Sequence, residues 1–86
     1  MIRVDILSQP SEKPQNVENV IRFAAKQVGI EVQVNHTTNF AAYSQFAINP
    51  SQTPIIFING SLEFAGRVPE INLLKLRLAE IRNQGP

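Results

Sequence analysis

The chain has 86 residues, of which 43% are hydrophobic, so we expect a single domain over residues 1–86 whose core needs no disulfide or metal. The formal net charge of +1 gives no electrostatic reason to expect nucleic acid, a membrane surface or another polyanion as a partner. The absence of cysteine excludes disulfides, thiolate metal sites and thiol catalysis.

Two further patterns bear on location. The N-terminus is too short and too alternating for a signal peptide, reading MIRVDIL. No apolar run approaches the roughly 18 residues that a membrane span needs. We therefore expect a cytoplasmic protein without a membrane segment.

The first half of the chain has the pattern of a strand, a helix and a second strand. Apolar residues alternate with polar ones over residues 2–7, which predicts a strand with one apolar face. After a turn, apolar residues recur every three or four positions from about Pro14 to Val28, which predicts a helix that Gly29 ends. Alternation from Ile30 to Val34 predicts the second strand, and residues 35–39 have the polar composition of a turn.

The second half is predicted to hold a helix, a hairpin and a last helix. Residues 40–47 suit a short helix, and residues 49–52 suit a loop. Pro54 opens an apolar strand over residues 55–58, and Asn59-Gly60 is a common hairpin turn because a type I′ turn needs positive φ at both positions. The returning strand, residues 61–65, has Leu62 and Phe64 on one face.

The last helix is predicted to begin at Pro69 and to leave residues 83–86 frayed. Its apolar stripe consists of Ile71, Leu74, Leu78 and Ile81, widened by Leu73 and Leu76. The complete order is βαβαββα, and its first βαβ unit must be parallel and right-handed. The fold class is therefore α/β, with a four-stranded mixed sheet flanked by three helices.

This order, together with QTPIIFINGSLEFAGRVP at residues 52–69, resembles the thioredoxin-like fold, and most of all its small glutaredoxin-sized disulfide proteins from archaea and bacteria. Thr53-Pro54 falls on the Thr-Pro of that family, whose peptide bond is cis there. Asn59-Gly60 falls on its hairpin turn, and Gly66-Arg67-Val68-Pro69 falls on the segment that leads into its last helix. The order and spacing of these motifs make the resemblance specific over the full chain.

The chain departs from the family at the redox motif. The positions of the Cys-x-x-Cys pair fall on Ser11-Glu12-Lys13-Pro14, so both thiols are absent. A serine hydroxyl has no redox chemistry and needs a base to act as a nucleophile. The only histidine, His36, is predicted just after the second strand at the sheet edge, too far from Ser11 to serve. Ser11 is better interpreted as a turn residue or a helix N-cap.

Other chemistry near this turn has little support in the sequence. Asp5 is expected within the first strand, where it could bond a neighbouring side chain, and Glu12 in a solvated turn, so they do not suggest an acid–base pair. One histidine and scattered carboxylates predict no metal site, and we expect no cofactor. An anion could bind at the N-terminus of the first helix near Lys13, although Pro14 removes one donor there.

The resemblance implies one binding feature that needs no thiol. In thioredoxin-like proteins the residue before the cis-proline offers its backbone to an extended peptide that docks as an added strand. Here Thr53, Pro54, the Ser11 turn and the loop with Gly66 and Arg67 would line that groove. The leading hypothesis is thus a redox-inactive, non-catalytic module that binds a protein or extended peptide, with no nucleic-acid or membrane partner.

Three alternatives stay open. The first is a non-thiol enzyme, or a protein that binds a small thiol or anion, using the N-terminus of the first helix. The second is an assembly or homodimerisation unit that pairs through its edge strands, Ile30 to Val34 or Ser61 to Ala65. The third is an inherited scaffold in which Pro54 only shapes the entry to its strand.

Overall fold

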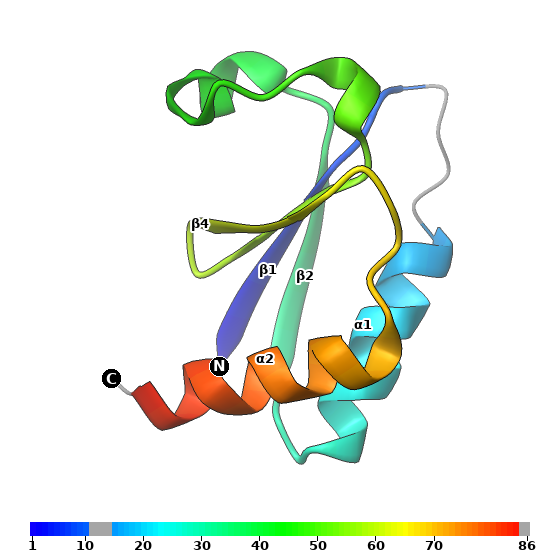
Figure 1. Ribbon diagram of the computed structural model, residues 1–86, viewed down its shortest axis with the longest axis vertical. Helices are drawn as coiled ribbons and strands as arrows, with labels where there is room; N and C mark the ends of the chain where they lie inside the picture. The colour runs from blue at the N-terminus through cyan, green and yellow to red at the C-terminus, as the bar shows by residue number, and fades with distance from the viewer. Residues whose placement is uncertain (11–14, 85–86) are drawn as a thin grey trace.

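Four strands form one mixed sheet in the computed structural model, which describes residues 1–10 and 15–84 (Figure 1). The strands are β1 (Ile2–Leu7), β2 (Val32–Thr37), β3 (Ile55–Ile58) and β4 (Ser61–Ala65), arranged in the order β2-β1-β3-β4. β1 pairs with β2 in parallel and with β3 in antiparallel orientation, and β3 and β4 form an antiparallel hairpin. The predicted α/β class and mixed sheet are confirmed.

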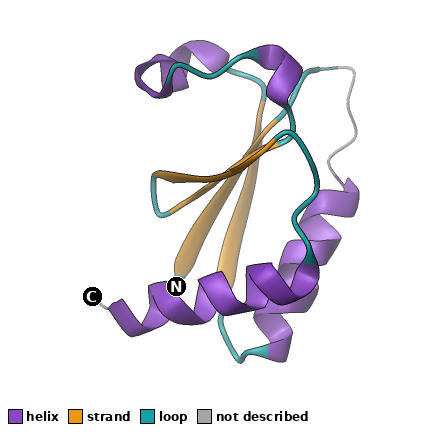
Figure 2. Cartoon of the chain, in the orientation of Figure 1, coloured by secondary structure: helices purple, strands orange, loops and turns teal. Residues whose placement is uncertain are grey.

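The helices lie on both faces of the sheet. The two α-helices, α1 (Gln15–Gln27) and α2 (Ile71–Gln84), contact each other and pack on one face (Figure 2). The 3-10 segment η1 (Phe40–Phe46) packs against the other face, and a second short 3-10 turn, η2 (Pro50–Gln52), follows it. The predicted short helix over residues 40–47 is therefore a 3-10 helix.

Two hydrophobic clusters result from the alternation of side chains along the strands. Val4 and Ile6 of β1 belong to the larger cluster, which also contains buried residues of α1, α2 and β3. Leu7 belongs to the smaller cluster, with Ile55 and Phe57 of β3 beneath the aromatic side chains of η1. The central strands are thus covered on both faces.

Two turns have the geometry that their sequences predict. Gly29 follows α1 with φ of +68°, a conformation that glycine adopts at the C-terminal end of helices. In the β3–β4 hairpin Asn59 and Gly60 have φ values of +51° and +85°, as a type I′ turn requires.

The second strand lies further along the chain than predicted. β2 begins at Val32 and ends at Thr37, so the polar residues 35–37 are strand and not turn, and His36 lies within the strand. The register explains the difference, because all six residues of β1 pair in parallel with β2, from Ile2 opposite Val32 to Leu7 opposite Thr37. Polar side chains are acceptable there because β2 is an edge strand.

The apolar stripe of α2 is narrower than predicted. Leu74 and Leu78 are fully buried, whereas Leu73 and Leu76 are 52% and 60% exposed. α2 rests on the sheet with one side and on α1 with another, so side chains on its remaining circumference face solvent. The helix also continues to Gln84, so the predicted fraying of residues 83 and 84 was wrong.

A β-bulge changes the face of the sheet on which side chains of β4 lie. The pairing of β3 with β4 shifts register between Ile56 and Phe57, so that Phe64 lies opposite Ile56 and Leu62 opposite Phe57. Phe64 packs against the larger cluster, whereas Leu62 remains 40% exposed. The prediction that both side chains share one face was therefore wrong, because a bulge inserts one extra residue into the alternation.

Candidate functional site

Three segments that are distant in the sequence meet at the end of the sheet where β1 ends (Figure 1). The Pro50 carbonyl oxygen accepts a hydrogen bond from Gln9 Nε2 at 2.7 Å and another from Thr53 Oγ1 at 3.1 Å. The segment after β1, the turn η2 and the entry to β3 are thereby tied together. The predicted site residue Thr53 lies at this junction.

The turn before Thr53 is held in a defined shape by a capping box. The Asn49 side chain accepts a hydrogen bond from the Ser51 backbone, and the Gln52 side chain accepts one from the Asn49 backbone, at 2.9 and 3.0 Å. Thr53 follows in an extended conformation, and the Thr53–Pro54 peptide bond is cis. The segment over residues 49–52 that was predicted as a loop is thus an ordered 3-10 turn.

The loop after β4 joins the same surface. The Gly66 backbone N–H donates to the Pro54 carbonyl at 3.2 Å, and Gly66 has φ of +92°, where a residue with a Cβ would be strained. Arg67 and Val68 follow and are exposed, with Val68 44% exposed. The structure therefore brings Thr53, Pro54 and Gly66 together and places Arg67 beside them.

The degenerate redox positions cannot be located in the same way. Ser11, Glu12, Lys13 and Pro14 lie outside the described residues, as does the anion site predicted at the N-terminus of the first helix. The described neighbours on either side are Pro10 and Gln15, and Gln9 reaches Pro50 as described above.

A groove of about 620 Å³ adjoins the loop that carries Arg67. Its walls come from β4, from this loop and from the first turns of α2, and its apolar lining includes Phe64, Val68 and Leu73. Glu70 also lines it, and Glu70 Oε2 accepts a hydrogen bond from the Leu73 backbone at the start of α2. The groove therefore combines apolar side chains with charged ones, and Arg67 is an exposed cation at one side of it.

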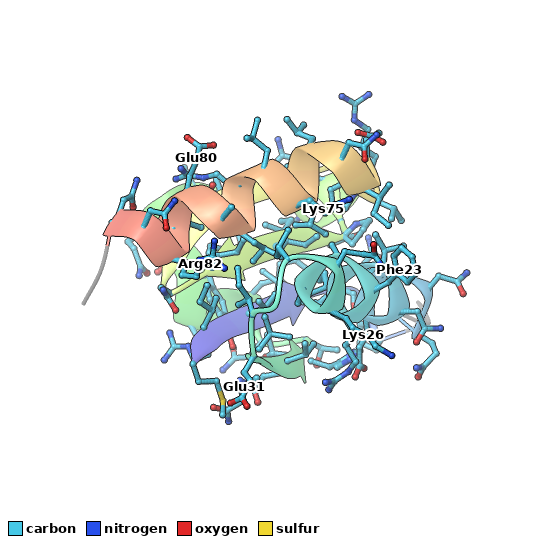
Figure 3. The ribbon with its side chains drawn as sticks, turned by 90° about the horizontal axis from the view of Figure 1, so that it is seen from below. Phe23, Lys26, Glu31, Lys75, Glu80 and Arg82 are labelled. Atoms are coloured by element: carbon cyan, nitrogen blue, oxygen red, sulfur yellow. The ribbon has the colours of Figure 1, made fainter. Side chains whose placement is uncertain are left out.

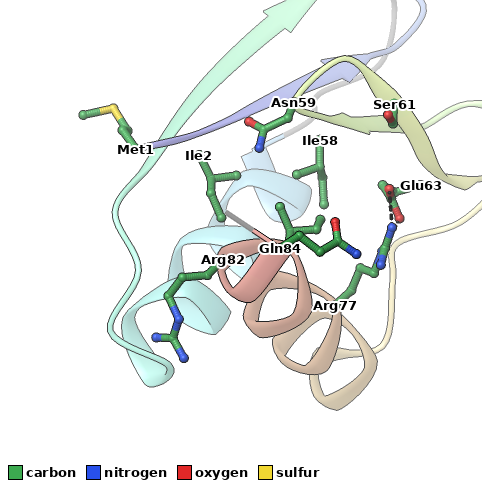
Figure 4. Close-up of a pocket in the computed structure, with 10 residues that line it drawn as sticks. Met1, Ile2, Ile58, Asn59, Ser61, Glu63, Arg77, Arg82 and Gln84 are labelled. Atoms are coloured by element: carbon green, nitrogen blue, oxygen red, sulfur yellow. Dashed lines mark hydrogen bonds and ion pairs between the residues drawn. The ribbon is translucent and has the colours of Figure 1, made fainter. Parts of the chain in front are cut away.

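A second hollow, of about 440 Å³, lies between the β3–β4 hairpin and the C-terminal half of α2 (Figure 4). Its most prominent polar contact is bidentate, because Arg77 donates to both carboxylate oxygens of Glu63 at 2.6 and 3.0 Å. The Glu63 carboxylate holds the pKa of Arg77 above its usual value. This pair joins α2 to β4.

Asp5 and His36 take part in structural pairs. Asp5 is buried and accepts a hydrogen bond from Asn35 Nδ2 at 3.2 Å, with the Arg3 guanidinium also 3.2 Å away, so the predicted bond to a neighbouring side chain is confirmed. His36 of β2 contacts the Glu18 carboxylate on α1. Within the described residues no group of three His, Asp or Glu side chains could hold a metal ion.

Glu18 gives a prediction about acid stability. Its pKa is lowered by the hydrogen bond from Arg22, at 2.6 Å, and then by the contact with His36. A carboxyl with a lowered folded pKa stabilises the protein fully above the ordinary value of 4.5 and loses that contribution as the pH falls through the folded pKa. Glu18→Gln is therefore expected to cost about 0.5–1 kcal/mol of unfolding free energy at pH 7 and progressively less below pH 4.5.

Urea titrations over a pH series measure this difference, with Glu31→Gln as the control because Glu31 is exposed and makes no ion pair within the described part of the chain. A Glu18→Gln penalty that stayed constant from neutral pH into strong acid would contradict the assignment.

The sequence reasoning missed two residues of this junction, Gln9 and Pro50. A local signal did exist for the second, because Asn49 followed by Gln52 has the spacing of a capping box. Gln9 carries no such signal, since its partner lies 41 residues away.

The comparisons with known proteins agree with this geometry. The family model described as "Thioredoxin domain" matches residues 2–77, most of the chain, and no curated protein matches it. No helix among the described residues is long and apolar enough to cross a membrane. The resemblance inferred from residues 52–69 is confirmed, and with no cysteine present the chain has lost the redox motif. The chain belongs to the thioredoxin domain family.

Proposed function

We propose that this protein is a redox-inactive member of the family that binds a protein or an extended peptide on the surface formed by residues 51–54 and 66–68. The observation that carries the proposal is the hydrogen bond between Gly66 N and the Pro54 carbonyl, which joins the two loops into one continuous surface. Exposed Arg67 and Val68 offer a cation and an apolar side chain on that surface.

The chemistry of the chain favours binding over catalysis. Thiol–disulfide exchange needs a thiolate as the attacking group, and the sequence supplies none. Hydroxyl activation needs a neighbouring base, whereas His36 contacts Glu18 between β2 and α1. A surface held by the capping box and by the Pro50 carbonyl is instead suited to recognition, because such bonds reduce the cost of ordering it on binding.

A selection from a random peptide library displayed on phage tests this proposal. The chain is expected to enrich extended peptides, and one enriched peptide is then measured by fluorescence polarisation. Ser51→Arg places a long side chain on the surface without removing a bond of the Ser51 side chain in the described structure, and Arg67→Glu reverses the charge beside it. Each is expected to weaken binding about tenfold or more, which corresponds to about 1.4 kcal/mol.

Phe23→Arg is the matched control, because Phe23 is 53% exposed on α1 and belongs to neither loop. It is expected to bind the peptide as tightly as the parent chain. Equal affinity of all four proteins, or a selection that enriches no peptide, would overturn the proposed site.

A further inference from the structure

The hydrogen bonds between β1 and β2 show which residues of β2 direct their backbone groups toward the free edge of the sheet. Ile2 N donates to the Glu31 carbonyl and Ser8 N donates to the Thr37 carbonyl, both at 3.0 Å. Residues 31 and 37 therefore turn their backbone groups toward β1. Because these groups alternate along a strand, Val32, Val34 and His36 turn their N–H and C=O groups to the free edge.

β2 lacks the features by which edge strands avoid pairing. Its six residues contain no Lys, Arg, Asp, Glu, Pro or Gly, and its register with β1 is unbroken. The other edge strand, β4, carries both a bulge and the charged Glu63, which bonds Arg77 of α2. Of the two edges that could support assembly, β2 is therefore the open one.

The charged side chains beside this edge indicate which kind of partner strand is complementary to it. Glu18, Arg22 and Lys26 follow one another at intervals of four residues along α1, and α1 runs antiparallel to β2 (Figure 1). Four helical residues rise about 6 Å, nearly the length of two strand residues. Since Glu18 contacts His36, Arg22 stands level with Val34 and Lys26 level with Val32.

The position of Lys26 agrees with this alignment. Lys26 lines the same surface hollow as Arg22, Glu31 and Val32, and Figure 3 shows Lys26 and Glu31 on the side of the molecule away from α2. Within the described part of the chain Lys26 makes no ion pair, whereas Arg22 pairs with Glu18. A carboxylate brought to this place would therefore meet an uncompensated cation.

We propose that two copies of this chain pair in antiparallel orientation through β2, with a two-fold axis at Val34, to form one continuous eight-stranded sheet. Val34 of one copy then pairs with Val34 of the other, and Val32 of each pairs with His36 of the other, so that all outward backbone groups of the strand are used. The same axis sets Glu18 of each copy opposite Lys26 of the other.

Two properties favour a second copy as the occupant over an unrelated strand. The pattern Glu18, Arg22, Lys26 is complementary to its own reverse at both ends, as suits a symmetric interface. Arg22 meets its own copy at the axis, where each guanidinium is paired with Glu18 of its own chain. The edge as a whole carries two cations and two carboxylates, counting Glu31, and the chain has a net charge of only +1, so two copies do not repel each other strongly.

Sedimentation velocity of the full chain tests this proposal. The parent chain is measured over a series from about 1 µM to 1 mM and is expected to sediment increasingly as a dimer, because mass action raises the dimer share with concentration. Lys26→Glu sets two like charges opposite each other at each end and is expected to raise the dissociation constant about tenfold or more. Lys75→Glu makes the same change on α2, away from this edge, and is expected to leave the constant unchanged (Figure 3).

Cross-linking fixes the register, because the chain has no cysteine of its own. The proposed axis places Gln33 of one copy opposite Asn35 of the other in a non-hydrogen-bonded pair, with Cα atoms about 4.5 Å apart, a separation that a disulfide spans. A mixture of Gln33→Cys and Asn35→Cys chains is expected to form the mixed disulfide under mild oxidation. A parent chain that stays monomeric throughout, or a dimer that ignores Lys26→Glu and yields no mixed disulfide, would overturn the proposal.

Discussion

Phe57→Ala is expected to lower the free energy of unfolding by about 3–5 kcal/mol. Phe57 is fully buried on β3, and the rings of Tyr43 and Phe46 lie 4.4 and 4.9 Å from it between ring centres. Removing the ring leaves a cavity between the sheet and η1, and takes away the surface on which η1 packs. Urea unfolding followed by circular dichroism measures the loss.

Phe23→Ala is the matched control, because it makes the same change at a side chain that is 53% exposed on α1. Its effect is expected within about 0.5 kcal/mol of zero. The near-ultraviolet signal of Tyr43 gives a second readout, since its ring should lose its fixed environment in the Phe57 variant alone. A cost below about 1 kcal/mol for Phe57→Ala would show that η1 does not depend on this packing.

Leu78→Ala is expected to cost about 2–5 kcal/mol of unfolding free energy. Leu78 is fully buried in the larger cluster, where α2 meets the sheet and α1. Leu76→Ala, two residues away on the same helix, removes the same atoms from a side chain that is 60% exposed and is expected to change stability by no more than about 0.5 kcal/mol.

The pair of leucine variants separates burial from helix propensity, because both exchanges are Leu to Ala within one helix and so share any change in propensity. The same urea titration measures both. Similar losses at the two positions would mean that Leu76 is covered in solution, and the orientation of α2 on the sheet would then be wrong.

The element order followed from local patterns in the sequence. Alternation identified β1 and β4, an unbroken apolar run identified β3, and the three-to-four spacing identified α1 and α2. These patterns are local because they reflect which faces of each element contact the core. The position of β2 was missed, since its polar residues 35–37 are held in the strand by pairing with β1 and not by their own preference. Strand propensity is overridden by context more readily than helix propensity.

The direction in which side chains point was harder to predict than the type of each element. Leu73 and Leu76 look like core residues on a helical projection, yet the neighbouring layers leave their side of α2 uncovered. Leu62 and Phe64 lie on different faces because of the bulge. The bulge depends on the pairing with β3, and no pattern within residues 61–65 indicates it. Neither outcome is encoded in the segment in which it occurs.

The candidate site was predictable in part. Thr53, Pro54 and Gly66 could be chosen because motif order in residues 52–69 carries the family resemblance, and the structure brings these three together. Gln9 joins them through a side-chain bond to the Pro50 carbonyl, a contact between residues far apart in the chain. Such long-range hydrogen bonds depend on the completed topology, which no local pattern contains.

The two faces of the sheet are covered by hydrophobic clusters of very different size. Among the described residues the larger cluster has eleven buried side chains and the smaller one, beneath η1, has three. Proteins open locally where the fewest apolar contacts must be broken, so η1 is the unit that detaches at least cost while both α-helices stay docked. Because η1 leads through η2 to Thr53, local detachment of η1 would change the shape of the proposed binding surface while the sheet stays folded. A bound peptide would in turn keep η1 packed on the sheet.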